Sequence, residues 1–247
     1  MVKIIMKNKY DFIFLDTVDS TNTYAKRIIE ERNIDNTVII AQMQTNGRGR
    51  VGRSFYSPSN NGIYMSVIKE VNCPLNNLNM VTVETAVAVS YAIDSMINKN
   101  TGIKWVNDIY LDGKKVCGIL VESVNDIKNG MISHIIIGIG INVKNTDDFP
   151  PDIKDIAGAI NISLDKRNEL ITGILNELDK FLFNNSSINY YRKKSILINR
   201  EIIYLKNNNE YKATVININD NGNLVVVNEN NKEEIIHSGE IRIHKIK

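Results

Sequence analysis

The sequence predicts an α+β domain with a mixed sheet, followed by a small all-β unit. Up to about residue 196, expected strands and helices alternate irregularly, without the repeated strand–helix–strand order of a parallel α/β sheet. From about residue 198, short apolar runs are separated by Asn- and Gly-rich turns, a pattern typical of short antiparallel strands. We therefore expect two units, residues 1–196 and residues 197–247.

Hydrophobic periodicity predicts the elements of the first unit. Short runs rich in branched and aromatic residues indicate strands, and apolar residues at helical spacing indicate helices. The expected strands are 11–18, 38–41, 63–68, 103–111, 115–123 and 132–143, and the expected helices are 21–33, 78–98 and 164–183. Asp19 or Ser20 can cap the first helix. The polar, glycine-bearing stretch 44–61 is typical of a long loop.

The second unit is expected to be a small β-barrel. Its predicted strands are 202–205, 211–218, 224–227 and 241–243, and Asp220-Asn221-Gly222 is a hairpin signal. A unit of about 50 residues buries too little surface to be very stable alone. We therefore expect it to dock on the first unit.

Composition excludes several classes of protein. Of the 247 residues, 43% are hydrophobic and 23% charged, as in ordinary globular proteins. The 30 basic and 28 acidic residues give a net charge of only +2, without the basic excess typical of proteins that bind nucleic acid non-specifically. No apolar run approaches the ~20 residues that span a bilayer. The two cysteines and three histidines lack disulfide or metal-ligand spacing. We expect a soluble cytoplasmic protein without nucleic-acid or membrane partners.

The segment Gln44–Arg53, which we call the Gly-Arg loop, is the most informative of the chain. Three arginines alternate with Gly47, Gly49 and Gly52, so the backbone can approach a ligand while guanidinium groups bind phosphate or carboxylate oxygens. The glycines also satisfy the dinucleotide pattern GxGxxG, but an extended or turn-like stretch follows where that motif requires a helix. A solvated basic loop explains this segment alone equally well.

A second unusual segment is Lys104-Trp105-Val106-Asn107-Asp108, which holds the only tryptophan of the chain. The apolar run that follows starts with Lys115 and contains Gly118, which again permits close approach of a ligand. Taken singly, Lys115 is typical of a strand-end lysine and Asn107-Asp108 of a turn. Their combination favours a binding site.

Four segments together resemble the catalytic domain of biotin–protein ligases, in order and in spacing. They are Asp19–Asn22, Gln44–Arg53, Lys104–Asp108 with Lys115–Glu122, and Gly138–Val143. The resemblance spans roughly residues 11–185, and the C-terminal segment resembles the family's SH3-like barrel. It implies the class II synthetase-like fold of biotin and lipoate ligases.

The resemblance also implies roles for individual residues. Implied biotin-binding residues are Ser20, Thr21, Asn22, Gln44, Arg48, Gly49, Arg50, Lys115 and Gly118. Implied nucleotide-binding residues are Arg50, Arg53, Phe55, Lys104, Trp105, Asn107 and Asn142. Implied catalytic residues are Arg48, Arg50, Asp108 and Lys115, with Asp108 near magnesium or the acceptor lysine. The chain departs from the family at Val106, where proline is usual, and at Phe55, where tryptophan is frequent.

The implied reaction uses ATP and Mg²⁺ to convert biotin into biotinyl-5'-AMP and then attaches biotin to a lysine of a biotin carboxyl carrier domain. Its first step brings a carboxylate to a triphosphate, and two like charges at 4 Å repel by about 4 kcal/mol at an effective dielectric near 20. Arg48, Arg50, Arg53 and Lys115 are the groups expected to offset this repulsion.

Three alternatives stay open at this point. A lipoate ligase or octanoyl transferase has the same fold, although the Gly-Arg loop and the Lys-Trp-x-Asn-Asp segment fit biotin ligases better. The second is a biotin-sensing repressor, and the third is a non-catalytic adenylate-binding module. The family pattern begins about ten residues after Met1, so we expect the monofunctional type without an N-terminal DNA-binding domain. Exposed sheet edges can pair two copies, and the sequence does not decide between monomer and homodimer.

Overall fold

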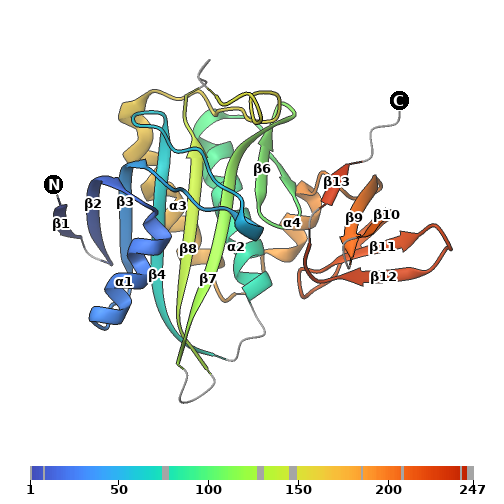
Figure 1. Ribbon diagram of the computed structural model, residues 1–247, viewed down its shortest axis with the longest axis horizontal. Coiled ribbons are helices and arrows are strands. Elements are labelled where there is room, and N and C mark those ends of the chain that lie inside the picture. The colour runs from blue at the N-terminus through green and yellow to red at the C-terminus, as the bar shows by residue number, and fades with distance from the viewer. Residues whose placement is uncertain are drawn as a thin grey trace.

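The computed structural model describes residues 2–7, 9–73, 78–126, 131–144, 149–184, 186–206, 209–239 and 241–243. In these residues an eight-stranded sheet carries helices on both faces, and a five-stranded antiparallel sheet follows at the C-terminal end (Figure 1). The predicted α+β class with a mixed sheet is confirmed.

The large sheet has one parallel pair, β2 and β3, which α1 (Thr21–Glu31) connects. All its other neighbouring strands pair antiparallel, in the order β1-β2-β3-β4-β8-β7-β6-β5. Its strands are β1 (Val2–Lys7), β2 (Tyr10–Val18), β3 (Thr37–Gln44), β4 (Gly62–Cys73), β5 (Gly102–Lys104), β6 (Asp108–Leu111), β7 (Lys114–Asp126) and β8 (Met131–Asn142).

The two faces of this sheet differ because successive strand residues point to opposite sides. In β8, Ile137, Ile139 and Ile141 lie in the large core shared with α2 and α3. On the opposite face of β8, Ile136 packs under α1 in a smaller core, and Gly138 and Gly140 follow it. The α1 face is therefore closed at one end and hollow at the other. Helices of the first unit are α2 (Leu78–Ile97), α3 (Arg167–Phe181) and α4 (Ile188–Lys194), with 3-10 turns η1 (Arg50–Gly52) and η3 (Leu164–Lys166).

Helix α2 is apolar on nearly all sides, and the sheet, α3 and α4 cover these sides. Its stretch Asn79–Ile97 is long and apolar enough to cross a membrane by length and composition alone. However, 67% of that stretch is buried inside the protein, which is typical of the core helix of a globular domain.

The C-terminal sheet has the strand order β12-β11-β10-β9-β13. The predicted hairpin turn at Asp220–Gly222 is confirmed, since it joins β10 and β11 and Gly222 adopts a φ of +74°. Barrel closure and the boundary at residues 196/197 stay predictions. The strands are β9 (Glu201–Lys206), β10 (Asn209–Ile218), β11 (Leu224–Asn228), β12 (Glu233–Ile236) and β13 (Ile241–Ile243).

The hairpin turn of the C-terminal sheet contacts the first unit directly. Trp105 Nε1 donates a buried hydrogen bond to the carbonyl oxygen of Gly222 at 2.8 Å. Arg192 on α4 pairs with Asp220 at 2.6 Å. The docking of the two units therefore involves the hairpin turn on one side and the only tryptophan of the chain on the other.

The structure differs from the predicted elements in five respects. β1, β12 and α4 were not predicted, because a seven-residue helix shows too little periodicity and an edge strand depends on its partner. The expected strand 103–111 is two strands, β5 and β6, with a turn at 105–107 that contains a cis Trp105–Val106 peptide bond. Ser20 occupies the N-cap position of α1 without a side-chain capping hydrogen bond, and Asp19 instead pairs with Arg27.

We expect Trp105→Phe to lower the free energy of unfolding by about 1–3 kcal/mol, because the Gly222 carbonyl would stay buried without its donor. Urea denaturation measures this. Tyr91→Phe, which removes a hydroxyl from an exposed side chain, is the control and should leave the midpoint unchanged. An unchanged midpoint for Trp105→Phe would contradict a stabilising role of this contact.

Candidate active site

A cavity of about 400 Å³ lies over the hollow part of the α1 face. Its walls come from the N-terminus of α1, the Gly-Arg loop, the 104–108 segment and strands β7 and β8. Every residue that the sequence predicted for the site lines it except Asn142. Those residues are Ser20, Thr21, Asn22, Gln44, Arg48, Gly49, Arg50, Arg53, Phe55, Lys104, Trp105, Asn107, Asp108, Lys115 and Gly118.

A second cavity of about 750 Å³ adjoins the first at Phe55 and Lys115, which line both. Asn142 lines this second cavity, and its side-chain amide donates to the carbonyl oxygen of Gly158 at 2.9 Å. Phe149 and Tyr56 contribute an edge-to-face ring pair to the same wall. The two cavities together form an elongated site with Lys115 at its middle.

Glycines form the floor of the first cavity. Gly118 in β7 and Gly140 in β8 are cross-strand partners, and the ring of Phe55 lies over them. A Cβ at Gly140 would stand 2.6 Å from the Phe55 ring, and one at Gly118 would stand 3.2 Å from it. A side chain at either position would therefore crowd the Phe55 ring, and glycine at both positions lets this ring pack close to the sheet.

The inner end of the cavity carries a chain of neutral hydrogen-bonding groups. The backbone N–H of Thr21 donates to Gln44 Oε1 at 2.9 Å, and Gln44 Nε2 donates to Ser57 Oγ at 2.8 Å. Ser66, which is fully buried, accepts a hydrogen bond from the Thr21 hydroxyl at 2.7 Å between the two oxygens. These contacts fix the orientation of the Gln44 amide, so this end suits a neutral ligand group that both donates and accepts hydrogen bonds.

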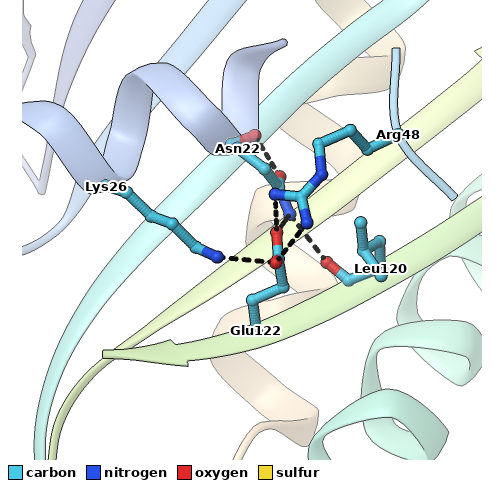
Figure 2. Close-up of polar contacts among 6 residues, drawn as sticks. Asn22, Lys26, Arg48, Leu120 and Glu122 are labelled. Carbon is cyan, nitrogen blue, oxygen red and sulfur yellow. Dashed lines mark hydrogen bonds and ion pairs between the residues drawn. The ribbon is translucent and has the colours of Figure 1, made fainter. Parts of the chain in front are cut away.

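Glu122 on β7 stands behind this wall, and Figure 2 shows the groups that converge on it. Lys26 Nζ lies 2.7 Å from Oε1, Asn22 Nδ2 lies 2.9 Å from Oε2, and Arg48 contacts both oxygens at 3.1 and 3.2 Å. Burial by itself would raise the pKa of Glu122, but these hydrogen bonds and the two cations lower it below its ordinary value. Glu122 is therefore ionised at neutral pH.

The outer part of the first cavity is strongly cationic. Lys115 Nζ pairs with Asp108 Oδ1 at 2.7 Å, and Arg50 Nη1 donates to Asn107 Oδ1 at 3.2 Å. Among the described residues that line the cavity, Asp108 is the only carboxylate, whereas six side chains are cationic. This charge balance favours a ligand with several negative charges. The cationic lining residues are Arg48, Arg50, Arg53, Lys104, Lys115 and Arg242.

Within the described residues, no group of three or more His, Cys, Asp or Glu side chains could hold a metal ion by itself. Asp108 therefore stays a predicted contact of a metal that arrives with a ligand.

Sequence reasoning missed several residues of this site. Ser66 and Glu122 are polar residues inside apolar strands, and this exception to the pattern is a signal that could have identified them. The local sequence around Arg242 does not indicate a site residue. Arg242 lies on β13 and lines the cavity only because the C-terminal sheet docks on the first unit.

The lowered pKa of Glu122 predicts a pH-dependent contribution to stability. A carboxyl group whose pKa is lowered by folding stabilises the protein above its unfolded pKa, about 4.3, and loses this effect as pH falls through the folded value. At pH 7 we expect Glu122→Gln to cost about 1–3 kcal/mol, with the difference from wild type vanishing in acid. Urea denaturation from pH 7 to pH 3.5 measures it, with Glu30→Gln at an exposed position of α1 as control. A constant difference over this range would show that the carboxylate charge is not the cause.

The fold and the site together define a mixed-sheet domain with an elongated binding site. One end is neutral and hydrogen-bonding, the floor is glycine, and the middle is rich in cationic groups. This is the class of site that binds a small molecule together with a phosphate-bearing ligand.

Comparison with known proteins gives the family. The chain matches the Biotin/lipoate A/B protein ligase family over residues 14–142, more than half of its length, and it belongs to this family. It is 39% identical over 150 residues to the bifunctional ligase/repressor BirA of Bacillus spizizenii, an alignment that covers 60% of this chain and 46% of that protein. The chain thus spans less than half the length of that relative.

Two further relatives cover more of the chain. The biotin--[acetyl-CoA-carboxylase] ligase of Mycobacterium tuberculosis is 27% identical over 203 residues, which cover 78% of this chain and 73% of that protein. The structure of the Aquifex aeolicus biotin protein ligase in complex with biotin and ATP superposes with a TM-score of 0.76 at 28% identity. That superposition covers 95% of this chain and 99% of the other.

Proposed function

We propose that this chain is a biotin–protein ligase, which activates biotin with ATP and transfers it to a lysine of a biotin carboxyl carrier domain. The observation that carries the proposal is the continuous site in which Lys115 and the Gly-Arg loop stand between a neutral inner end and a second cavity. The similar Aquifex structure, which is a complex with biotin and ATP, supports this pair of substrates.

The inner end of the first cavity takes the ureido ring of biotin in this proposal. A ureido group has N–H donors and a carbonyl acceptor, and the groups around Thr21, Gln44 and the buried Ser20 are neutral partners of the same kind. The apolar chain of biotin then runs beside Gly118 and the Phe55 ring, which brings its carboxylate toward Lys115.

The cationic middle of the site takes the groups that react. The biotin carboxylate attacks the α-phosphorus of ATP, and pyrophosphate leaves. Arg48, Arg50 and Lys115 offset the repulsion between the two anions, which amounts to several kcal/mol. Phe55 and Asn142 line the second cavity, where we place the nucleotide together with Arg53. Lys104, Trp105 and Asn107 line the first cavity.

The second step transfers biotin from the adenylate to the acceptor. The lysine amine of the carrier domain attacks the carbonyl carbon, AMP leaves, and the amine loses a proton. Asp108 is the only carboxylate that lines the first cavity in the described part of the chain, so we assign it to the acceptor amine or to magnesium. A single carboxylate fits magnesium that is held mainly by phosphate oxygens and water, and the ion would neutralise phosphate charge.

The proposed setting of this reaction is the cytoplasm, where biotin, ATP and a carboxylase carrier domain are the partners. The near-neutral net charge gives no reason to include a nucleic acid.

We expect Lys115→Ala to lower the rate of biotin-dependent pyrophosphate release by about 10²–10³, because one preorganised charge at the reacting centre is lost. Lys99→Ala, which removes an exposed lysine paired with Asp112, should react at the wild-type rate. The intact mass of a carrier domain incubated with biotin and Mg-ATP shows transfer. An acceptor that gains lipoate instead of biotin would reassign the substrate, and an acceptor that gains neither would remove the proposal.

Ligands should protect the Gly-Arg loop from protease. Val51 is 75% exposed and follows Arg50, so trypsin can reach this bond in the free protein. Biotin plus ATP should slow cleavage there, because the phosphates bind the loop arginines and order the loop over the adenylate. Mass spectrometry of the fragments measures the rate, with biotin alone as comparison. Equal cleavage rates with and without both ligands would contradict ordering of the loop.

A further inference from the structure

We propose that Glu122 is a positioning residue for biotin recognition, which fixes the side chains of Arg48 and Asn22 without contacting the ligand itself. The inference rests on the proposed function. Glu122 does not line the cavity, whereas the two residues that it holds do. The three come from β7, the Gly-Arg loop and α1, so one carboxylate joins three separate walls of the site (Figure 2).

Both oxygens of Glu122 are shared between partners. Oε1 accepts from Lys26 at 2.7 Å and contacts Arg48 Nη2 at 3.1 Å. Oε2 accepts from Asn22 at 2.9 Å and from Arg48 Nη1 at 3.2 Å. The contact with Arg48 is therefore bidentate, a geometry that fixes the plane of the guanidinium group.

The Asn22 amide has one orientation that satisfies this network. Its nitrogen donates to Glu122 and to the carbonyl oxygen of Leu120 at 3.2 Å, and its oxygen accepts from Ser66 at 2.6 Å. A flipped amide would place its oxygen against the ionised Glu122 carboxylate and lose both donor contacts. Because both amide hydrogens are used, Asn22 shapes the inner wall and has only spare acceptor capacity for a ligand.

Arg48 keeps the capacity to bind an anion while it is held. A guanidinium group has five N–H donors, and Glu122 takes two of those of Arg48. The other three contact no acceptor in the described parts of the chain. A ligand can therefore bind Arg48 without displacing Glu122, which distinguishes positioning from competition between Glu122 and substrate.

Lys26 provides a matched control within the same cluster. It contacts Glu122 but lines neither cavity, and it comes from a partly exposed position on α1. Lys26→Met leaves the Glu122 carboxylate with Arg48 and Asn22. Glu122→Gln removes the charge and replaces one acceptor oxygen by an NH2 group, which faces Arg48 in either orientation of the amide. If positioning is specific to these two residues, the two substitutions have different effects.

The experiment measures pyrophosphate release at varied biotin, together with tryptic cleavage after Arg48 in the ligand-free protein. For Glu122→Gln we expect the KM for biotin to rise about tenfold, kcat to change less than threefold, and cleavage after Arg48 to accelerate. Lys26→Met should keep the wild-type KM and cleavage rate. Glu122→Asp keeps the charge on a shorter side chain, so its KM for biotin should fall between those of wild type and Glu122→Gln. If Glu122→Gln does not fold, Glu122→Asp is the variant that tests the proposal.

Several results would overturn the proposal. A lower KM for Glu122→Gln would show that Glu122 competes with the ligand for Arg48. An unchanged KM with unchanged cleavage would show no positioning, and an equal rise in Lys26→Met would assign the effect to the general charge of the cluster. A wild type that fails to use biotin while cleavage in Glu122→Gln still accelerates would instead reject the proposed function, because the tryptic measurement needs no ligand.

Discussion

The architecture of the site depends on a packing constraint in β8 and its neighbours. Alternation along β8 places isoleucines against α2 and α3 on one face, and this face closes the large core. On the other face the alternation gives Ile136 under α1 and then Gly138 and Gly140, where the sheet carries no side chains. The same strand thus anchors the fold and leaves the hollow. Any larger residue at Gly140 would meet Phe55, so the hollow and the loop above it are matched in size.

The two carboxylates at this hollow, Asp108 and Glu122, differ in their ion pairs and in their exposure to a ligand. Asp108 lines the cavity and pairs with one cation, Lys115, which stays partly exposed to an incoming ligand. Glu122 does not line the cavity, and its negative charge is balanced within the protein by Lys26 and Arg48 and by a hydrogen bond from Asn22. The first carboxylate can therefore take part in chemistry. The second can act only through the groups that it orients.

Much of this could be predicted from sequence, because the informative signals are local. The alternation of β8, the glycines and arginines of the loop and the Lys-Trp-x-Asn-Asp segment are each read over about ten residues. The network around Glu122 could not be predicted in the same way, since its partners Asn22 and Arg48 stand 100 and 74 positions away in the chain. Nothing in the local sequence says which carboxylate meets which cation. The same holds for Arg242, whose place in the cavity depends on how the second unit docks.

The C-terminal sheet contacts residues that line the site. Trp105 lines the first cavity with one part of its side chain and donates from Nε1 to Gly222 of the C-terminal sheet. Tyr191 on α4 donates to the carbonyl oxygen of Val106 at 3.0 Å, so the 105–107 turn is held from two sides. Asn107, at the end of the same turn, accepts from Arg50 of the Gly-Arg loop. A series of hydrogen bonds therefore runs from the C-terminal sheet through the 105–107 turn to the Gly-Arg loop. Because Arg242 of this sheet also lines the first cavity, the small unit supplies part of the site's wall.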